Sequence, residues 1–262
     1  MILVILPALD DADLERVLVI DGEGPEEITV MGCLAIDEAH HQLYVSDHAK
    51  QKIFSYDMDS VMVDSLYKPQ VKTAMNETLF PSEYQYINDT LSIAVLIKPT
   101  STSTFNQFLG RWNMNTGEMI PMKYTHPDIQ KKRITFAASE KAGIYVECYT
   151  RHDLMTICSL DGELLYNIYG PDWDGGNGNK LQSFGTVMIG NDKIFVSYCG
   201  EDYARDSFPT KILVFDLEGN YLKTLETGYK ISDCCYDSFN NRIILSLNDV
   251  VQFAYLDIDG II

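Results

Sequence analysis

The sequence predicts an all-β fold, a β-propeller built from four-stranded antiparallel blades. A strand–turn–strand hairpin recurs along the 262 residues, a second pair of strands precedes five of its copies, and no long amphipathic helix pattern occurs. The repeat length of roughly 40 to 55 residues is the period expected of propeller blades. Short antiparallel strands at this spacing favour a propeller over a sandwich.

The clearest copy of the hairpin spans 213–225. Val214 and Phe215 are strand formers, and Gly219 can adopt the positive φ that a tight hairpin turn requires. Polar turn residues separate the two strands, and Tyr221 begins the second one. Related hairpins are expected at 4–20, 54–66, 110–122, 156–169 and from 254 to the end of the chain.

A second pair of strands precedes five of these hairpins and completes a four-strand unit. The second strand of each pair is the most apolar of its unit, which is typical of a strand buried between neighbouring blades. The expected pairs are 34–37 with 42–46, 84–87 with 91–97, 134–137 with 144–148, 186–189 with 193–197, and 232–236 with 242–246.

The two ends of the chain complement each other. The last unit has only three expected strands, and residues 14–20 form a spare fourth strand. Pairing them would remove an open sheet edge, which otherwise invites aggregation. We therefore expect one domain, 1–262, with five blades; the alternative is six blades with an incomplete first blade. The blades are expected at 33–67, 84–123, 134–169, 186–226 and 231–262, the last completed by 14–20.

The composition is that of an acidic globular protein. Hydrophobic residues make up 46% of the chain, which argues against disorder, and the formal net charge of −18 would repel a nucleic-acid backbone. No apolar run approaches the roughly 18 residues of a membrane span. The opening Met1–Pro7 predicts a strand and not a targeting segment. We expect a monomer with no nucleic-acid partner and no transmembrane segment.

Binding is expected at one face of the propeller. The loops between second and third strands, and those between successive blades, share a face and are long and dissimilar here, as binding loops usually are. They could hold a small polar ligand, a glycan, or a peptide or protein. The alternative is that their polar side chains are solvated loop residues. The candidate binding residues are Asp47, His48, Arg151, His152, Trp173, Asp202, Tyr203 and Arg205.

The sequence contains none of the short catalytic motifs of serine hydrolases, zinc proteases or nucleotide-binding enzymes. His48 and His152 occupy equivalent positions in two repeats, however. With nearby carboxylates they could form a metal or acid–base cluster at a central channel. The carboxylates are those of Asp47, Asp153 and Asp202. A non-catalytic binding module is the leading hypothesis, and a metal-dependent, lactonase-like hydrolase is the competing one.

One loop has the composition of a calcium site. The stretch 172–179 alternates oxygen ligands with flexible glycines, and Asp172 and Asp174 are its candidate metal ligands. It departs from the EF-hand pattern, because Asn177 stands at the glycine position and no Glu closes the loop. The alternative is a flexible loop without a metal. Calcium is the cofactor that this loop suggests, and we expect none to be required.

The stretch 21–27, directly after the strand at 14–20, carries a family resemblance. The stretch 22–27 reads Gly-Glu-Gly-Pro-Glu-Glu and resembles the G-x-G-P-x-E motif of TolB-like, six-bladed β-propellers with NHL-like repeats, which are common in Bacteroidetes. The spacing of the expected strands along the whole chain is also similar to that of the family. The resemblance implies an exported protein of the periplasm or cell surface, without catalytic activity as a class.

Overall fold

The computed structural model describes residues 2–3, 17–19, 22–64, 67–101, 104–178, 180–202 and 207–261. These residues are almost entirely β-strands, with one short helix, α1 (Met58–Val63), and one 3₁₀ turn, η1 (Glu38–His40). Within the described residues no helix is long and apolar enough to cross a membrane. The chain divides into two compact units, Met1–Pro121 and Met122–Ile262, and each is described by itself.

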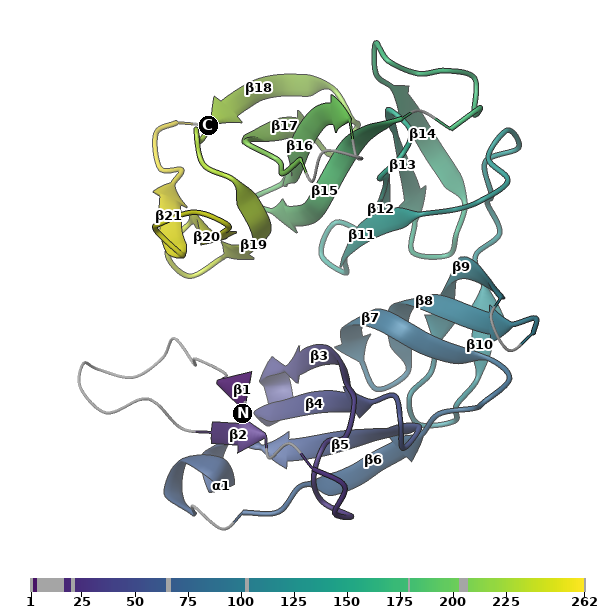
Figure 1. The fold of residues 1–262 in the computed structure, drawn as a ribbon, viewed down its shortest axis with the longest axis vertical. Coiled ribbons are helices and arrows are strands. Elements are labelled where there is room, and N and C mark those ends of the chain that lie inside the picture. Colours follow the sequence, from purple (N-terminus) through teal and green to yellow (C-terminus); the bar gives the residue numbers. More distant parts are fainter. Residues whose placement is uncertain are drawn as a thin grey trace. The chain divides into compact units, whose positions relative to one another are not determined.

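The first unit contains two four-stranded antiparallel sheets in which strands adjacent in sequence pair with one another (Figure 1). One sheet consists of β3 (Met31–Asp37), β4 (Gln42–Asp47), β5 (Lys52–Asp57) and β6 (Gln70–Ala74). The other consists of β7 (Phe80–Asn88), β8 (Leu91–Pro99), β9 (Phe105–Trp112) and β10 (Met119–Pro121).

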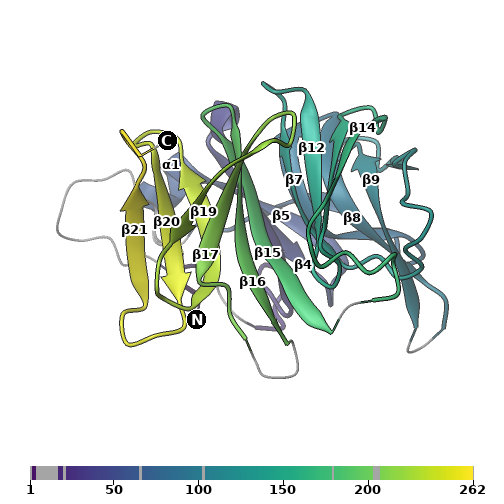
Figure 2. The same ribbon diagram turned by 90° about the horizontal axis from the view of Figure 1, so that it is seen from above.

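The second unit repeats this plan in two four-stranded sheets and one sheet of three described strands (Figure 2). The first is β11 (Ile134–Ser139), β12 (Ile144–Tyr149), β13 (Leu154–Ser159) and β14 (Leu164–Tyr169). The next is β15 (Leu181–Gly190), β16 (Lys193–Asp202), β17 (Lys211–Asp216) and β18 (Tyr221–Glu226). The last is β19 (Ile231–Asp237), β20 (Arg242–Leu247) and β21 (Phe253–Asp257).

The hydrophobic cores lie between neighbouring sheets. In the second unit one buried cluster joins β12 and β13 to β15 and β16, and another joins the β15–β18 sheet to β19 and β20. In four of the five sheets the second strand is the most thoroughly buried, as its apolar sequence predicts; β12, for example, is buried along its whole length. Burial of both faces explains why these strands lack the polar–apolar alternation of half-exposed strands.

The hairpin predicted at 213–225 is confirmed as β17 and β18. The carboxylate of Asp216 accepts the backbone N–H groups of Glu218 at 3.1 Å and Asn220 at 2.8 Å, which closes the turn. Gly219 has φ +84°, the left-handed conformation that the turn requires.

One strand prediction is wrong. The hairpin predicted at 54–66 places its second strand over 61–66, but this part of the chain begins as the helix α1, and the fourth strand of the sheet is β6. The reason is local capping: the Asp57 carboxylate accepts the N–H of Ser60 at 2.7 Å, a helix N-cap, where the sequence suggested a hairpin turn.

The blade-closing strand predicted at 14–20 lies mostly outside the described residues. Its described part, β2 (Val17–Val19), pairs antiparallel with β1 (Ile2–Leu3). Within the described residues the β19–β21 sheet has three strands.

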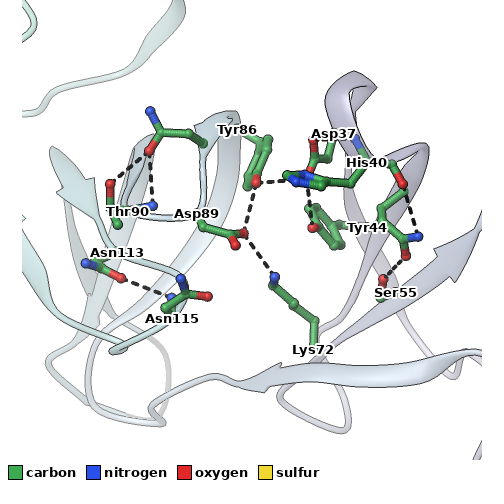
Figure 3. A network of polar contacts seen from close by, with 12 residues as sticks. Asp37, His40, Tyr44, Ser55, Lys72, Tyr86, Asp89, Thr90, Asn113 and Asn115 are labelled. Carbon is green, nitrogen blue, oxygen red and sulfur yellow. Dashed lines mark hydrogen bonds and ion pairs between the residues drawn. The ribbon is translucent and has the colours of Figure 1, made fainter.

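A polar network links the two sheets of the first unit at their turns (Figure 3). The Tyr86 hydroxyl lies between two carboxylates, 3.0 Å from Asp37 and 2.9 Å from Asp89, and can donate its one proton to only one of them at a time. Lys72 pairs with Asp89 at 3.0 Å, and His40 contacts Asp37 at 2.8 Å. Every member has a partner from the protein itself, so we interpret this network as an interlock between sheets.

Candidate functional site

Two arginines lie at one end of the β11–β14 sheet, where its first strand begins and its second strand ends. Ile134 pairs with Tyr149, and the ladder continues because the N–H of Thr150 donates to the carbonyl oxygen of Arg133 at 3.0 Å. Arg133 and Arg151 therefore emerge from neighbouring chain segments at the same end of the sheet.

In the basic segment 131–133 the middle side chain is buried and the two outer side chains are exposed to solvent. Lys132 forms a buried ion pair with Glu147, with 2.6 Å between Nζ and Oε1. Glu147 also accepts the hydroxyl proton of Tyr149 at 3.2 Å. Lys131 and Arg133 are exposed, and neither has a carboxylate within ion-pair distance among the described residues. Lys132 is thus structural, whereas its two neighbours present positive charge to solvent.

The loop 170–178 is fastened to the end of β13 and to the segment before β11. The N–H of Gly170 donates to the Asp153 carbonyl at 2.8 Å, and the N–H of Asp172 donates to the Asp153 carboxylate at 3.0 Å. Gly176, with φ +82°, passes so close to Asp128 that a Cβ would lie 2.4 Å from the Asp128 carbonyl oxygen. Only glycine fits this close approach without displacing one of the two segments.

Trp173 is the aromatic anchor of this loop. Its ring lies 5.1 Å from Tyr169, 5.4 Å from His126 and 6.0 Å from His152, measured between ring centroids. Tilted and edge-to-face arrangements of this kind add to the free energy of apolar burial. The cluster fixes the loop over two histidines.

Burial disfavours the charged state of both histidines. Burial lowers the pKa of His126, and Asp128 opposes this only in part. Its Nδ1 accepts the N–H of Asp128 at 3.3 Å, so the neutral ring carries its proton on Nε2 and donates it to the Tyr169 hydroxyl oxygen at 3.1 Å. Burial likewise lowers the pKa of His152, whose Nδ1 lies 3.8 Å from the Asp174 carboxylate, beyond hydrogen-bond distance.

These segments enclose a pocket of about 780 Å³ in the second unit. Among the described residues of its lining, four side chains are cationic and one, Asp128, is acidic. The lining also includes His152, the amides Gln130 and Asn177, and three glycines of the 170–178 loop. We call it the basic pocket; its cations are Lys131, Arg133, Arg151 and Lys180.

The structure brings several predicted binding residues to this pocket. Arg151 and His152 line it, and Trp173 and Asp174 contact His152 from the loop. Asp202 ends β16, where it pairs with Leu181, and does not line the basic pocket. Tyr203 and Arg205 lie outside the described residues.

The predicted residues of the first unit have structural contacts. Asp47 is fully buried at the end of β4, and its carboxylate accepts four backbone N–H groups at 2.8 to 3.2 Å. Burial tends to raise the pKa of Asp47, but these hydrogen bonds together hold it below its ordinary value. The ring of His48 fills the space above Gly32, where a Cβ would lie 2.3 Å from Nε2. The four donors to Asp47 are Thr29, Val30, Ala49 and Lys50.

The proposed metal sites are not tested by these contacts. In the loop, the Asp174 carboxylate faces His152, and Asp172 donates its N–H to Asp153. Among the described residues no group of three or more His, Cys, Asp or Glu side chains is arranged to hold a metal ion. His48 belongs to one unit and His152 to the other, so a cluster of the two stays a prediction.

Sequence reasoning found Arg151 but missed the other three cations that give the pocket its charge. Lys131, Arg133 and Lys180, like His126, lie in or beside the loops between successive blades, which the sequence assigned to the binding face. The clustering of three basic residues at 131–133 was the available signal.

Sheets paired in sequence order, together with a pocket among the loops at their ends, define this chain as a β-propeller module. The chain belongs to the DUF5128 family, described as a 6-bladed beta-propeller, whose model matches residues 15–147. The described residues form five blade sheets, and the six blades of the family match the alternative that the sequence left open. No curated protein gives a significant match.

Two solved structures with a similar fold come from Bacteroides species. A protein of unknown function from Bacteroides caccae is 12% identical with a TM-score of 0.51, over 88% of this chain and 78% of that one. The extracellular domain of a proposed one-component system, BT4673 of B. thetaiotaomicron, is 14% identical with a TM-score of 0.56, over 90% of this chain and 29% of that one. At these identities the likeness concerns the fold alone.

Proposed function

We propose that this chain is a non-catalytic recognition propeller that binds a small anionic ligand in the basic pocket. The observation that carries the proposal is the charge of the lining. Four of the chain's 20 Lys and Arg residues surround one pocket in which the described lining has a single carboxylate, although the whole chain has a formal net charge of −18. Such a local reversal of charge attracts an anion that the rest of the surface repels.

Different lining residues can contact the charged and the neutral groups of such a ligand. The planar guanidinium groups of Arg133 and Arg151 suit two-point hydrogen bonding to a carboxylate, sulfate or phosphate group, and the two lysines add point charges. Gln130 and Asn177 can bond to neutral hydroxyl or carbonyl groups of the ligand. A volume of about 780 Å³ is in the range of small-molecule sites.

Export to the periplasm or cell surface is part of this proposal. It is supported by the family resemblance of 22–27 and by the extracellular domain among the structures of similar fold. Recognition of a small anion by a propeller at that location is consistent with a sensing or scaffold role.

The test is a calorimetric titration with ligands matched except for charge. Glucuronate should bind and glucose should bind at least tenfold more weakly, because they differ in the carboxylate. Sulfate and phosphate, as competitors, show which anionic group the pocket prefers. Affinity should fall as salt is added, since the cations are exposed. Equal binding of glucose and glucuronate would refute the proposal. So would the absence of binding by glucuronate, sulfate and phosphate alike.

A further inference from the structure

A second pocket of the second unit lies between the β11–β14 and β15–β18 sheets. It has a volume of about 360 Å³ and an almost wholly apolar lining. Five of its lining residues are aromatic: Tyr169, Phe184, Tyr198, Phe215 and Tyr221. None of the described residues in its lining is Lys, Arg or His. We call it the aromatic pocket.

One carboxylate stands in this apolar lining. Asp153 is 2% exposed, and its carboxylate lies directly over Gly170, where a Cβ would be 2.0 Å from Oδ2. The N–H of Asp172 donates to it at 3.0 Å. Burial raises the pKa of Asp153; the hydrogen bond from the Asp172 N–H opposes this in part, and the charge of the Asp172 carboxylate adds to it more weakly. Among the described lining residues no cation compensates a negative charge in this position.

Some of the aromatic side chains form the buried interior of the pocket, and one lies at its exposed entrance. Phe184 and Tyr198 meet edge to face at 5.3 Å, and Phe215 and Tyr221 at 6.0 Å. Phe184 and Phe215 are buried, whereas Tyr221 is 57% exposed and forms part of the entrance. Aromatic faces attract cations through their quadrupole, most strongly where water is excluded.

We infer that the aromatic pocket binds the ammonium group of a small organic cation, with Asp153 as counter-ion and the tyrosine and phenylalanine rings around its apolar substituents. The lining favours an alkylated ammonium group over a metal ion, because calcium and magnesium require six or more oxygen ligands, including water, and this lining is mostly carbon. The site is separate from the basic pocket: Asp153 and His152 are consecutive but line different pockets.

The test compares choline with 3,3-dimethylbutan-1-ol, which has the same shape but carbon in place of the charged nitrogen. Binding is measured by calorimetry on the full chain. Choline should bind at least tenfold more tightly than the neutral analogue. Asp153→Asn should remove at least this tenfold preference, while its amide oxygen can still accept the Asp172 N–H.

A second variant, at an exposed position, tests the same pocket with little risk to the folding of the protein. Tyr221→Ala, at the exposed mouth, should weaken choline binding severalfold, whereas Tyr229→Ala, 47% exposed and outside the lining, should leave it unchanged. The inference is overturned if wild-type protein binds no choline, if the alcohol binds as well as choline, or if Asp153→Asn retains the preference. Glucuronate binding to the basic pocket is a separate readout, so either proposal can fail alone.

Discussion

The sharpest structural prediction concerns two glycines in the loop that walls the basic pocket. Gly176 and Gly178 both have positive φ, +82° and +89°, so an alanine at either one is strained by about 1 to 2 kcal/mol. They differ in surroundings. A Cβ at 176 would lie 2.4 Å from the Asp128 carbonyl oxygen, whereas a Cβ at 178 would meet nothing within 4 Å among the described residues. Gly178→Ala is therefore a matched control for the contact itself.

Gly176→Ala should cost about 1 to 3 kcal/mol more than Gly178→Ala, the usual cost of forcing extra atoms into a packed contact. At about 2 to 4 °C per kcal/mol for a unit of this size, the two melting temperatures should differ by several degrees. Trp173 fluorescence gives a second readout, since displacing the loop moves the ring away from His126 and Tyr169. Trp112, 1% exposed in the other unit, provides a constant background. Identical melting curves and spectra for the two variants would refute the packing of this loop against Asp128.

Three further predictions concern the contacts that hold each unit together. Asp47→Ala should destabilise the first unit by about 2 to 4 kcal/mol in denaturant titrations, because four backbone N–H groups lose their acceptor, whereas the exposed Asp59→Ala should have little effect. Since the folded pKa of Asp47 is lowered, its contribution should be complete above the unfolded value of about 3.9 and should disappear as the pH falls through the folded value. Tyr86→Phe should cost about 1 kcal/mol by leaving Asp37 and Asp89 without their shared hydroxyl, and unchanged stability would contradict the interlock in Figure 3. The lowered pKa values of His126 and His152 mean that the second unit should lose stability as the pH falls below the unfolded value of 6.5, and His126→Gln with His152→Gln should flatten that dependence in melting experiments.

The fold was predictable from the sequence because local signals agreed with tertiary structure. The Asp216–Asn220 turn, with glycine at the left-handed position, sits where the hairpin pattern places it. The failure at 61–66 has a local cause, since Asp57 and Ser60 can close a turn or cap a helix, and composition alone does not distinguish the two.

The candidate site was predictable only in part. Arg151 and His152 follow directly from the loop pattern, but the pocket also needs Lys131 and Arg133, which reach it through the alternation of side chains beside the buried Lys132–Glu147 pair. Asp47 shows the opposite case. From the sequence, a polar residue at this loop position indicates a ligand site. In the structure, however, the Asp47 carboxylate accepts hydrogen bonds from the surrounding backbone N–H groups. Such distinctions depend on which chain segments meet, and a single sequence does not carry that information.

The claim that the basic pocket binds an anion is tested most directly by comparing two double variants that each remove two positive charges from the second unit. Lys131→Ala with Arg133→Ala takes both from the pocket lining, and Lys123→Ala with Lys141→Ala takes both from exposed positions elsewhere. At about 0.7 to 1 kcal/mol for each exposed charge contact, the pocket variant should bind glucuronate about 10- to 30-fold more weakly than wild type, and the control within about twofold. Equal affinities for the two double variants would contradict the account.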